Sequence, residues 1–427
     1  MKRVTGARAA TNMPRIRRRQ IPSCASRCRQ ALTPFLTPAI HATALICILV
    51  FSGCTLLRHD PTPGRTSLGS PLVSVPVRTV ANVLVAELNT DRRASWRFLI
   101  DTGSSVTLVS PEFASRFGTS SPSSTLPLVS VRSASGQDAM LRAVTLRRLN
   151  LGEAQFEQVP ALVYDFSELS AHFGERIDGV LGFPVFRQTI LSLDYPHDRL
   201  LLSPTGGAAT LRPGTPIAFD TKTKTPLIQI EVEGQTLVAL IDSGSDGGLH
   251  LNTVGLKTSF AYGPVPGGVI TTMAGERPQQ IGRLAGSLRL GSYTVQQPIV
   301  DLTDELSSVG GAILKNYVVT FDQDRGNVTF FRESSAPLVM PSQPSTGMSF
   351  TRTSAYWKVA AVISGSPAAA AGINIGDLVI RIDGEPVSEW PLERFESQVA
   401  SVPEMDFTFL DGVVETVRSV RTYPLVP

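Results

Sequence analysis

The sequence predicts a mainly β protein in which two similar β lobes lie in tandem and are followed by a small α+β unit. Short apolar or alternating segments typical of strands recur along the chain, long periodic helices are scarce, and glycine (35) and proline (31) are plentiful. An apolar run that ends in aspartate, a small hydroxyl residue and glycine occurs twice, at residues 98–104 and 239–245. A Pro- and Ser-rich stretch then sets residues 348–427 apart as a separate unit.

The charge of the chain is unevenly distributed. The formal net charge is +3 over 427 residues, but residues 1–53 contain nine basic residues and no acidic one. The remaining residues hold 30 of the 39 basic residues and all 36 acidic residues, which gives them a net charge of −6. Because a nucleic-acid-binding body is normally basic, this distribution argues against a nucleic-acid partner.

The N-terminus has the pattern of a targeting segment, with a basic stretch followed by an apolar stretch at residues 42–51. The apolar stretch is too short to span a membrane comfortably and has the length typical of a secretory signal. The following Ser52-Gly53-Cys54 resembles a bacterial lipoprotein box, which implies lipidation of Cys54. We therefore expect a signal peptide over 1–53, a tether over 54–75, and a lipid-anchored, periplasm-facing protein of the cell envelope. The non-acidic Thr55 favours the outer membrane.

Residues after the tether form an internal repeat with four ordered anchors. The aspartate phrases are 141 residues apart, and the Leu-x-Leu-Gly phrases at 149–152 and 288–291 are 139 apart. The segments at 160–165 and 298–301 follow, and the segments at 191–194 and 319–322 come last, 128 apart. The shrinking offset indicates deletions in the second copy. We expect lobes over 76–207 and 208–333.

The repeated phrase offers two carboxylates, those of Asp101 and Asp242, that could meet between the lobes. Two adjacent carboxylates share one proton, so that one can act as a base toward water and the other as an acid toward a carbonyl oxygen. The supporting residues predicted for the two loops are Thr102, Gly103, Ser104, Ser243, Gly244 and Ser245. We expect the Thr102 and Ser243 hydroxyls to hydrogen-bond between the lobes. We expect the Ser104 and Ser245 hydroxyls to donate to the carboxylates, which lowers their pKa values and places activity on the acid side of neutral.

On these motifs the chain resembles the pepsin/retropepsin-like aspartic proteases, over about residues 76–333. The resemblance implies an aspartic endopeptidase that needs no metal or cofactor. It also implies an apolar-apolar-Gly element that braces each catalytic loop, and Gly182 supplies it in the first copy. In the second copy the candidate segment 310–315 places Lys315 where this glycine is expected. Flap candidates are residues 133–137 and 272–276.

The C-terminal unit, residues 348–427, resembles the PDZ domains attached to bacterial proteases, and residues 334–347 are its expected linker. The resemblance rests on the strand, Ser366-Pro367 helix start and Gly-Asp turn within residues 359–387. It implies that a peptide adds as a strand beside a helix. By position we expect the strand to be residues 357–362, with Trp357, Val359 and Ala361 at the peptide, and the helix to be residues 391–399.

Three functions remain open from the sequence. In the first, Asp101 and Asp242 form one dyad and the PDZ domain recruits peptide or protein substrates. In the second, the chain is a homodimer in which only Asp101 of each copy acts. In the third, the chain is a catalytically silent envelope scaffold that binds peptides through its PDZ domain. The chain could be a monomer or a homodimer.

Overall fold

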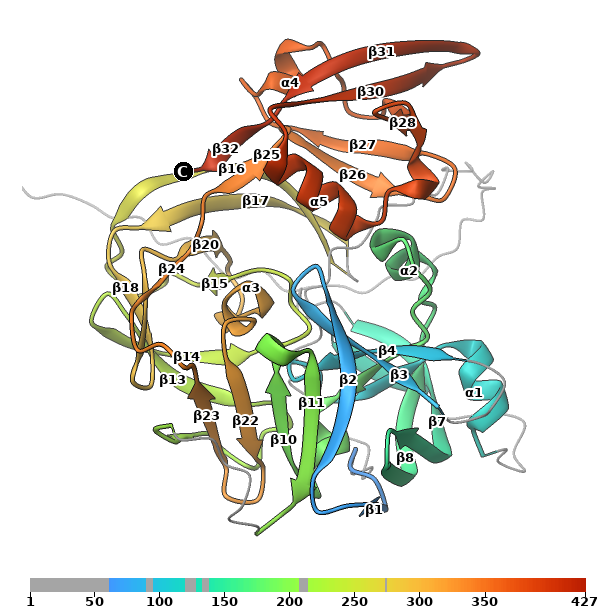
Figure 1. The fold of residues 1–427 in the computed structure, drawn as a ribbon, viewed down its shortest axis with the longest axis vertical. Helices are drawn as coiled ribbons and strands as arrows, with labels where there is room; N and C mark the ends of the chain where they lie inside the picture. The colour runs from blue at the N-terminus through green and yellow to red at the C-terminus, as the bar shows by residue number, and fades with distance from the viewer. Residues whose placement is uncertain (1–60, 90–94, 120–127, 133–137, 207–213, 273–274) are drawn as a thin grey trace, which may run out of the picture. The chain divides into compact units, whose positions relative to one another are not determined.

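The computed structural model describes residues 61–89, 95–119, 128–132, 138–206, 214–272 and 275–427 (Figure 1). These residues fall within one compact unit and are mainly β. The predicted signal peptide and Cys54 lie outside the described residues. None of the helices within these ranges is long and apolar enough to cross a membrane.

The largest sheet has 14 strands and crosses the predicted boundary between the two copies. In spatial order its strands are β12 (Ile217–Ala218), β23 (Asn327–Phe331), β22 (Val318–Asp322), β10 (Thr189–Asp194), β11 (Arg199–Pro204), β2 (Val73–Val80), β3 (Val83–Leu88), β4 (Trp96–Asp101), β9 (Gly179–Gly182), β5 (Thr107–Val109), β8 (Ala154–Val163), β7 (Asp138–Leu151) and β6 (Leu128–Arg132), with β1 (Arg65–Leu68) paired to β8.

A second sheet has 10 strands and belongs to the second copy of the repeat. Its order is β16 (Phe260–Thr272), β17 (Gly275–Leu284), β20 (Ile299–Leu302), β15 (Leu249–Leu251), β21 (Ser308–Val309), β14 (Gln235–Ile241), β13 (Leu227–Val232), β18 (Ser287–Leu290), β19 (Tyr293–Gln296) and β24 (Leu338–Val339).

The C-terminal residues form two smaller sheets. One pairs β25 (Gln343–Ser345) with β32 (Tyr423–Val426). The other has the order β26 (Met348–Arg352), β27 (Trp357–Val362), β28 (Leu378–Ile382), β30 (Glu404–Asp411) and β31 (Val414–Arg421), with β29 (Glu385–Pro386) beside β28. The helices among the described residues are α1 (Pro111–Phe117), α2 (Ser167–Phe173), η1 (Phe183–Phe186), η2 (Tyr195–His197), α3 (Gly311–Leu314), α4 (Pro367–Ala370), η3 (Val387–Glu389) and α5 (Leu392–Ser401).

The same set of strand pairings occurs twice. In the first copy β3 pairs antiparallel with β4, β4 pairs parallel with β9, and β5 pairs with both β8 and β9. In the second copy β13, β14, β21, β15 and β20 repeat these pairings in the same directions. The Leu-x-Leu-Gly anchors end in equivalent turns, because Gly152 and Gly291 both have a positive φ, at 57° and 59°. These matching pairings are the three-dimensional counterpart of the sequence repeat.

The two copies meet along β10 and β22, which pair antiparallel. Ser192 lies opposite Thr320, and their hydroxyls are 2.8 Å apart. Residues on either side are opposed symmetrically, with Leu191 facing Phe321 and Leu193 facing Val319. A two-fold relation between the copies therefore passes near the Ser192–Thr320 pair.

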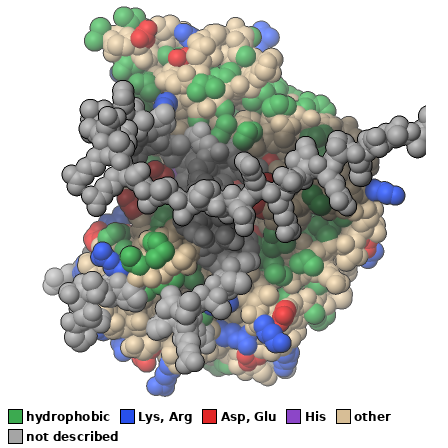
Figure 2. Space-filling view, turned by 180° about the vertical axis from the view of Figure 1, so that it is seen from behind, with side chains coloured by type: hydrophobic (Ala, Val, Ile, Leu, Met, Phe, Trp, Pro, Cys, Tyr) green, Lys and Arg blue, Asp and Glu red, His purple; other side chains and the backbone are tan. Residues whose placement is uncertain are grey.

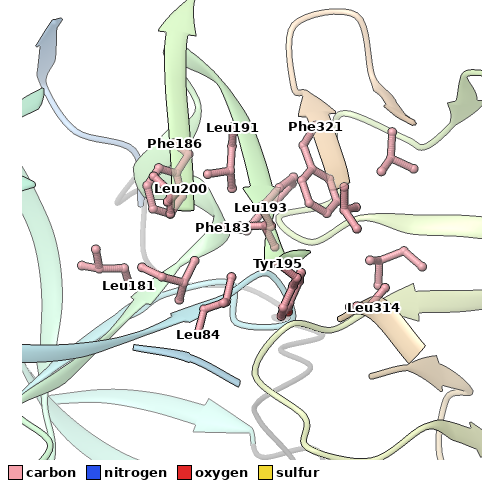
Figure 3. Packing of buried hydrophobic residues seen from close by; sticks show 14 of the residues in the cluster. Leu84, Leu181, Phe183, Phe186, Leu191, Leu193, Tyr195, Leu200, Leu314 and Phe321 are labelled. Carbon is pink, nitrogen blue, oxygen red and sulfur yellow. The ribbon is translucent and has the colours of Figure 1, made fainter. Parts of the chain in front are cut away.

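One apolar core extends across both copies. Figure 3 shows Leu193 and Tyr195 from the β10–η2 segment between Leu84 of the first copy and Leu314 of the second. All four side chains are at least 95% buried. Burying large apolar side chains of this kind contributes roughly 1.5–3 kcal/mol each to folding. The seam between the copies is thus held by an apolar core beneath the strands that lead to the two aspartates.

Two segments predicted as linkers contain strands, and both predictions were wrong in part. Within the predicted tether over 54–75, β1 pairs with β8 and β2 begins at Val73. Within the predicted linker over 334–347, β24 pairs with β19 and β25 pairs with β32. The Pro- and Ser-rich composition of these segments suits short strands at a sheet edge, where proline is tolerated, as well as it suits a linker.

The face of the molecule in Figure 2 has basic and acidic side chains interspersed rather than a single basic patch. This agrees with the net negative charge of the residues beyond 53.

Candidate active site

Asp101 and Asp242 lie together at the ends of equivalent strands. Asp101 is the last residue of β4, and Asp242 follows β14 directly. Both side chains are buried, with exposures of 0% and 3%. A Cβ placed on Gly103 would lie 2.5 Å from Asp242 Oδ1, so the Asp242 carboxyl packs directly against the Gly103 backbone. The glycine of the first loop therefore makes room for the carboxylate of the second.

The two loops are joined by reciprocal hydrogen bonds. The Thr102 hydroxyl donates to the Ile241 carbonyl (2.6 Å) and accepts from the Ser243 N–H (3.0 Å). The Ser243 hydroxyl donates to the Ile100 carbonyl (2.8 Å) and accepts from the Thr102 N–H (3.0 Å). The prediction that these hydroxyls bond between the two copies is confirmed.

Replacing Thr102 by valine is expected to destabilise the fold by roughly 3 kcal/mol. The change replaces the hydroxyl by a methyl group of similar volume. It leaves the Ser243 N–H and the Ile241 carbonyl without this partner in a buried site, at a cost of about 1–3 kcal/mol for each unsatisfied group. Urea unfolding of the chain from residue 61 measures the loss. Thr102→Ser keeps the hydroxyl and is the matched control, for which we expect a loss under about 1 kcal/mol. Equal stabilities for the valine and serine variants would contradict the assigned role of the hydroxyl.

The carboxylates are held by backbone N–H groups rather than by serine hydroxyls. Asp101 Oδ1 accepts from the N–H groups of Gly103 (2.8 Å) and Ser104 (3.1 Å), and Asp242 Oδ1 accepts from the Gly244 N–H (3.0 Å). The Ser104 hydroxyl instead donates to the Val106 carbonyl at 2.7 Å.

In the second loop, the Ser245 hydroxyl accepts from the Gly247 N–H at 3.3 Å. The prediction that Ser104 and Ser245 donate their hydroxyl protons to the carboxylates was therefore wrong. Each hydroxyl is used to close its own tight turn, and the turn presents backbone donors to the aspartate instead.

Burial determines the charge of the pair. Desolvation raises the pKa of Asp101 well above its ordinary value, and the neighbouring charge of Asp242 raises it further, against the opposing effect of the Gly103 and Ser104 N–H groups. Desolvation also raises the pKa of Asp242, against the opposing N–H of Gly244 and the charge of His250. The expected lowering of both pKa values was wrong, because the hydrogen bonds are outweighed by the loss of water. Asp101 Oδ2 has no hydrogen-bond partner among the described residues.

Tyr195 lies near the pair and was not identified from the sequence. Its ring is 4% exposed, and its hydroxyl has no hydrogen-bond partner within the described part of the chain. Burial raises the pKa of Tyr195, and the charges of Asp242 and Asp101 raise it further, so its phenol stays neutral. A tyrosine after a strand has no distinguishing sequence pattern, because its place beside the aspartates comes from the pairing of β10 with β22.

A glycine braces each aspartate loop. In the second copy this glycine is Gly310, and the prediction that placed it at position 315 was wrong. Gly182 lies opposite Asp101 in the β4–β9 pair, and a Cβ there would lie 2.2 Å from the Val106 carbonyl oxygen. In the second copy β14 pairs with β21 one residue before Gly310, where a Cβ would lie 2.5 Å from the Gly247 carbonyl oxygen.

The residues after the two glycines confirm this equivalence. The Phe183 N–H donates to the Ser104 carbonyl (2.9 Å), and the Gly311 N–H donates to the Ser245 carbonyl (2.7 Å). Lys315 is instead an exposed residue after α3, with its Nζ donating to Asn82 Oδ1. The offset of 128 residues in the last repeat anchor relates Gly182 to Gly310 and is the sequence signal for the correct register.

The flap candidates lie at the tips of two hairpins. Residues 133–137 are outside the described residues, and they join β6 to β7. Residues 273–274 are also outside them, and they join β16 to β17, which pair up to Thr272 and Gly275. The hairpins belong to equivalent positions in the two copies, since β7 pairs with β8 and β17 pairs with β20.

Within the described ranges, no group of three or more His, Cys, Asp or Glu residues is placed so that it could hold a metal ion. Polar atoms at the site come from two carboxyls, backbone N–H groups and hydroxyls. Such an arrangement can hold a water between two carboxyls of unequal protonation and transfer protons in both directions.

In the C-terminal unit the predicted strand, residues 357–362, and the predicted helix, residues 391–399, correspond to β27 and α5. The Ser366-Pro367 helix start is also confirmed, because Ser366 accepts the Ala369 N–H at the beginning of α4.

The assignment of Trp357, Val359 and Ala361 to peptide contact was wrong. These side chains are 2%, 0% and 8% exposed in the core, and β27 is paired with β26 along its length and with β28 at its start. The edge strand is β26, whose Phe350 contacts Phe395 of α5 at a ring distance of 5.8 Å.

A buried arginine joins this unit to the first copy of the repeat. Arg352 of β26 donates to the carbonyls of His172 (2.8 Å) and Trp390 (3.2 Å) and lies 3.7 Å over the Trp357 ring. Burial lowers the pKa of Arg352 to about 9. In addition, a Cβ on Gly174 would lie 2.9 Å from Pro391 Cα, so the chain after α2 packs tightly against the start of α5.

The comparisons with known families match two parts of the chain. The family described as Aspartyl protease matches residues 85–185, and the family described as PDZ domain matches residues 358–396. The first range contains Asp101 and Gly182, whereas Asp242 lies outside it. No curated protein matches the chain. The chain thus carries an aspartyl protease domain and a C-terminal PDZ domain.

Proposed function

We propose that the chain is an aspartic endopeptidase in which Asp101 and Asp242 form a single catalytic dyad between two pepsin-like lobes. The observation that carries the proposal is the meeting of the two buried aspartates on loops that brace each other through Thr102 and Ser243. The family match at residues 85–185 supports the class of chemistry. The repeated strand pairings support a second lobe built like the first.

In the proposed mechanism one carboxyl is ionised and the other protonated. The ionised Asp242 takes a proton from a water held between the pair, and the water attacks the peptide carbonyl. The protonated Asp101 donates to the carbonyl oxygen, which gives a neutral tetrahedral intermediate. The directions of the pKa shifts support this division, because Asp101 is fully buried and its pKa is raised by burial and by the charge of Asp242. On collapse the C–N bond breaks, Asp242 gives its proton to the leaving amine, and a hydroxyl proton of the intermediate returns to Asp101.

The proposal includes substrate recruitment by the PDZ domain and a lipid anchor at Cys54. An extended segment would add to β26 on the side facing α5, since β27 lies between β26 and β28 in the sheet. The anchor is supported by the basic and apolar segments before Cys54 and would hold the body at the periplasmic face of an envelope membrane. Removal of the signal peptide would leave Cys54 as the single cysteine of the chain.

Hydrolysis of a denatured protein by the chain from residue 61 tests the proposal. We expect cleavage that pepstatin inhibits and that a metal chelator does not affect. The absence of cleavage from about pH 3 to about pH 8, together with peptide binding by the C-terminal unit, would overturn the proposal in favour of the silent scaffold.

The pH profile of the same reaction gives a further prediction. A dyad works while it carries one proton, and raised pKa values move that window upward from the ordinary carboxyl range near about 4. We therefore expect kcat/KM to rise from about pH 4 toward neutrality and to fall once the second carboxyl ionises. A profile that is already maximal at about pH 4 would show that burial does not control the dyad.

A further inference from the structure

The outer edge of β31 is a long strand edge without a partner in the described part of the chain. β31 ends the sheet of the C-terminal unit, beyond β30, and Figure 1 shows it as the outermost strand there. Its register with β30 is continuous over eight residue pairs, without a bulge. The strand contains neither proline nor lysine, and its charged residues, Glu415, Arg418 and Arg421, include both signs and so can pair with each other in a second copy. Val413, Val414 and Val417 are 95%, 60% and 60% exposed.

The opposite edge of the same sheet, β26, is less regular and is the edge proposed above for a peptide. β26 has an irregularity between Ser349 and Phe350, and a Cβ on Gly268 of β16 would lie 2.4 Å from the Ser349 hydroxyl. Arg352 at the end of β26 is used in the contact with His172. The uninterrupted register of β31 makes it the edge suited to pairing with a whole second strand.

The hairpin turn decides which backbone groups of β31 point outward. Gly412 has a φ of 61°, and the two-residue loop is closed by Asp411 and Val414, which form a hydrogen-bonded pair in such hairpins. Because hydrogen-bonded and non-hydrogen-bonded pairs alternate along an antiparallel ladder, Glu415, Val417, Ser419 and Arg421 have their N–H and C=O groups at the free edge. These groups can be satisfied by a further strand.

A two-fold antiparallel pair of β31 strands must place one residue opposite its own copy. Placing Glu415 or Arg418 there would oppose like charges, which is destabilising. Placing Val417 there brings two exposed valines together in an outward hydrogen-bonded pair. It also puts Glu415 diagonally across from Arg421 of the second copy. The register centred on Thr416 instead places Val414 opposite Arg418 of the second copy.

We infer that β31 pairs antiparallel with β31 of a second copy of this chain, with Val417 at the two-fold axis. The pairing makes one continuous sheet from the two C-terminal units. It leaves the peptide edge at β26 open, because β26 and β31 end opposite sides of the sheet. The inference does not depend on the proposed peptidase activity.

Sedimentation velocity of the chain from residue 61, over a range of concentrations, tests the pairing. We expect a monomer–dimer equilibrium for the wild type. Val417→Pro removes an N–H that this ladder pattern directs away from β30, to the side where no described strand lies, and should weaken dimerisation at least about tenfold, or about 1.4 kcal/mol. Val417→Thr keeps the donor and is the matched control, which should still dimerise. A wild type that stays monomeric overturns the inference. The same holds if the monomer binds a vesicle or a peptide through this edge.

Disulfide cross-linking tests the register itself, since residues 61–427 contain no cysteine. Directly opposed residues in a hydrogen-bonded pair have Cα atoms about 5.5 Å apart, within the range that a disulfide can bridge. Val417→Cys should therefore form a covalent dimer on mild oxidation, faster than Thr416→Cys and faster than Val254→Cys, an 86% exposed control position far from β31 in the sequence. Equal rates for the three variants would overturn the inference, and faster cross-linking of Thr416→Cys would overturn the register.

Discussion

Asp101→Asn and Asp242→Asn are each expected to lower kcat/KM by at least about 10³-fold while the folded structure persists. The substitutions keep the size of the side chain and remove the group that exchanges a proton. Because the two aspartates act as one unit, we expect the double variant to lose little more than either single variant. The measurement is the initial rate of pepstatin-sensitive hydrolysis at a fixed substrate concentration below KM.

The same substitutions are expected to change stability in the opposite direction. The pKa of each buried aspartate is raised, so the folded chain binds these protons more tightly than the unfolded chain does. Stability from this source is complete at low pH and is lost as pH rises from the unfolded pKa near about 4 through the folded value. Asp101→Asn should therefore raise Tm at neutral pH and raise it less near about pH 3, where the wild-type carboxyl is largely protonated in both states.

Asp322→Asn is the matched control for both measurements. Asp322 is as deeply buried as the dyad, but its Oδ2 accepts from Arg325 at 2.7 Å, and its Oδ1 accepts from the N–H groups of Asp324 and Arg325. Losing this charge should lower Tm and leave the catalytic rate unchanged.

Full activity of Asp242→Asn beside an inactive Asp101→Asn would reject the single-chain dyad and support the homodimer that uses only Asp101.

Gly310→Ala is expected to destabilise the fold by about 3 kcal/mol or more and to abolish activity. A methyl group there would meet the Gly247 carbonyl oxygen at 2.5 Å and the Ser245 hydroxyl at 2.9 Å, and both belong to the loop that carries Asp242. That loop has little room to yield, because Ser243 is bonded to the other copy. Urea unfolding and the hydrolysis rate measure the two effects.

Lys315→Ala separates the two candidate bracing positions. Lys315 is exposed and has an ordinary helical backbone conformation, so its replacement should change stability by about 0.5 kcal/mol or less and keep activity. Gly182→Ala provides the equivalent test in the first copy, where the methyl group would lie 2.2 Å from the Val106 carbonyl oxygen. If Gly310→Ala kept stability and activity while Lys315→Ala lost them, the register of β14 and β21 would be refuted.

The sequence alone was sufficient to identify the two aspartates, the hydroxyls that join their loops, and the strands that carry them. Each of these features depends on residues a few positions apart, and the repeat supplied the long-range pairing. The bracing glycine of the second copy was misplaced because a deletion lies between the repeat anchors, although the offset of the last anchor fits Gly310.

Other features depend on packing that no local pattern contains. The raised pKa values come from burial of the carboxyls, and this desolvation outweighs the hydrogen bonds visible in the motif. The alternation of residues 357–362 predicted a strand correctly, but alternation cannot tell which strand has a free edge. That depends on β26 and β28 taking both sides of β27.

The reciprocal bonding of Thr102 and Ser243 has a consequence for biosynthesis. A nascent chain that has emerged through residue 207 already contains Asp101, but the Thr102 N–H and hydroxyl still lack the partners that come from residues 241 and 243. The last strands that complete the common sheet, β22 and β23, are translated only near residue 331. Under the proposed function, peptidase activity would therefore arise late in translation. A prematurely terminated chain would not cleave other proteins, even without a propeptide to inhibit it.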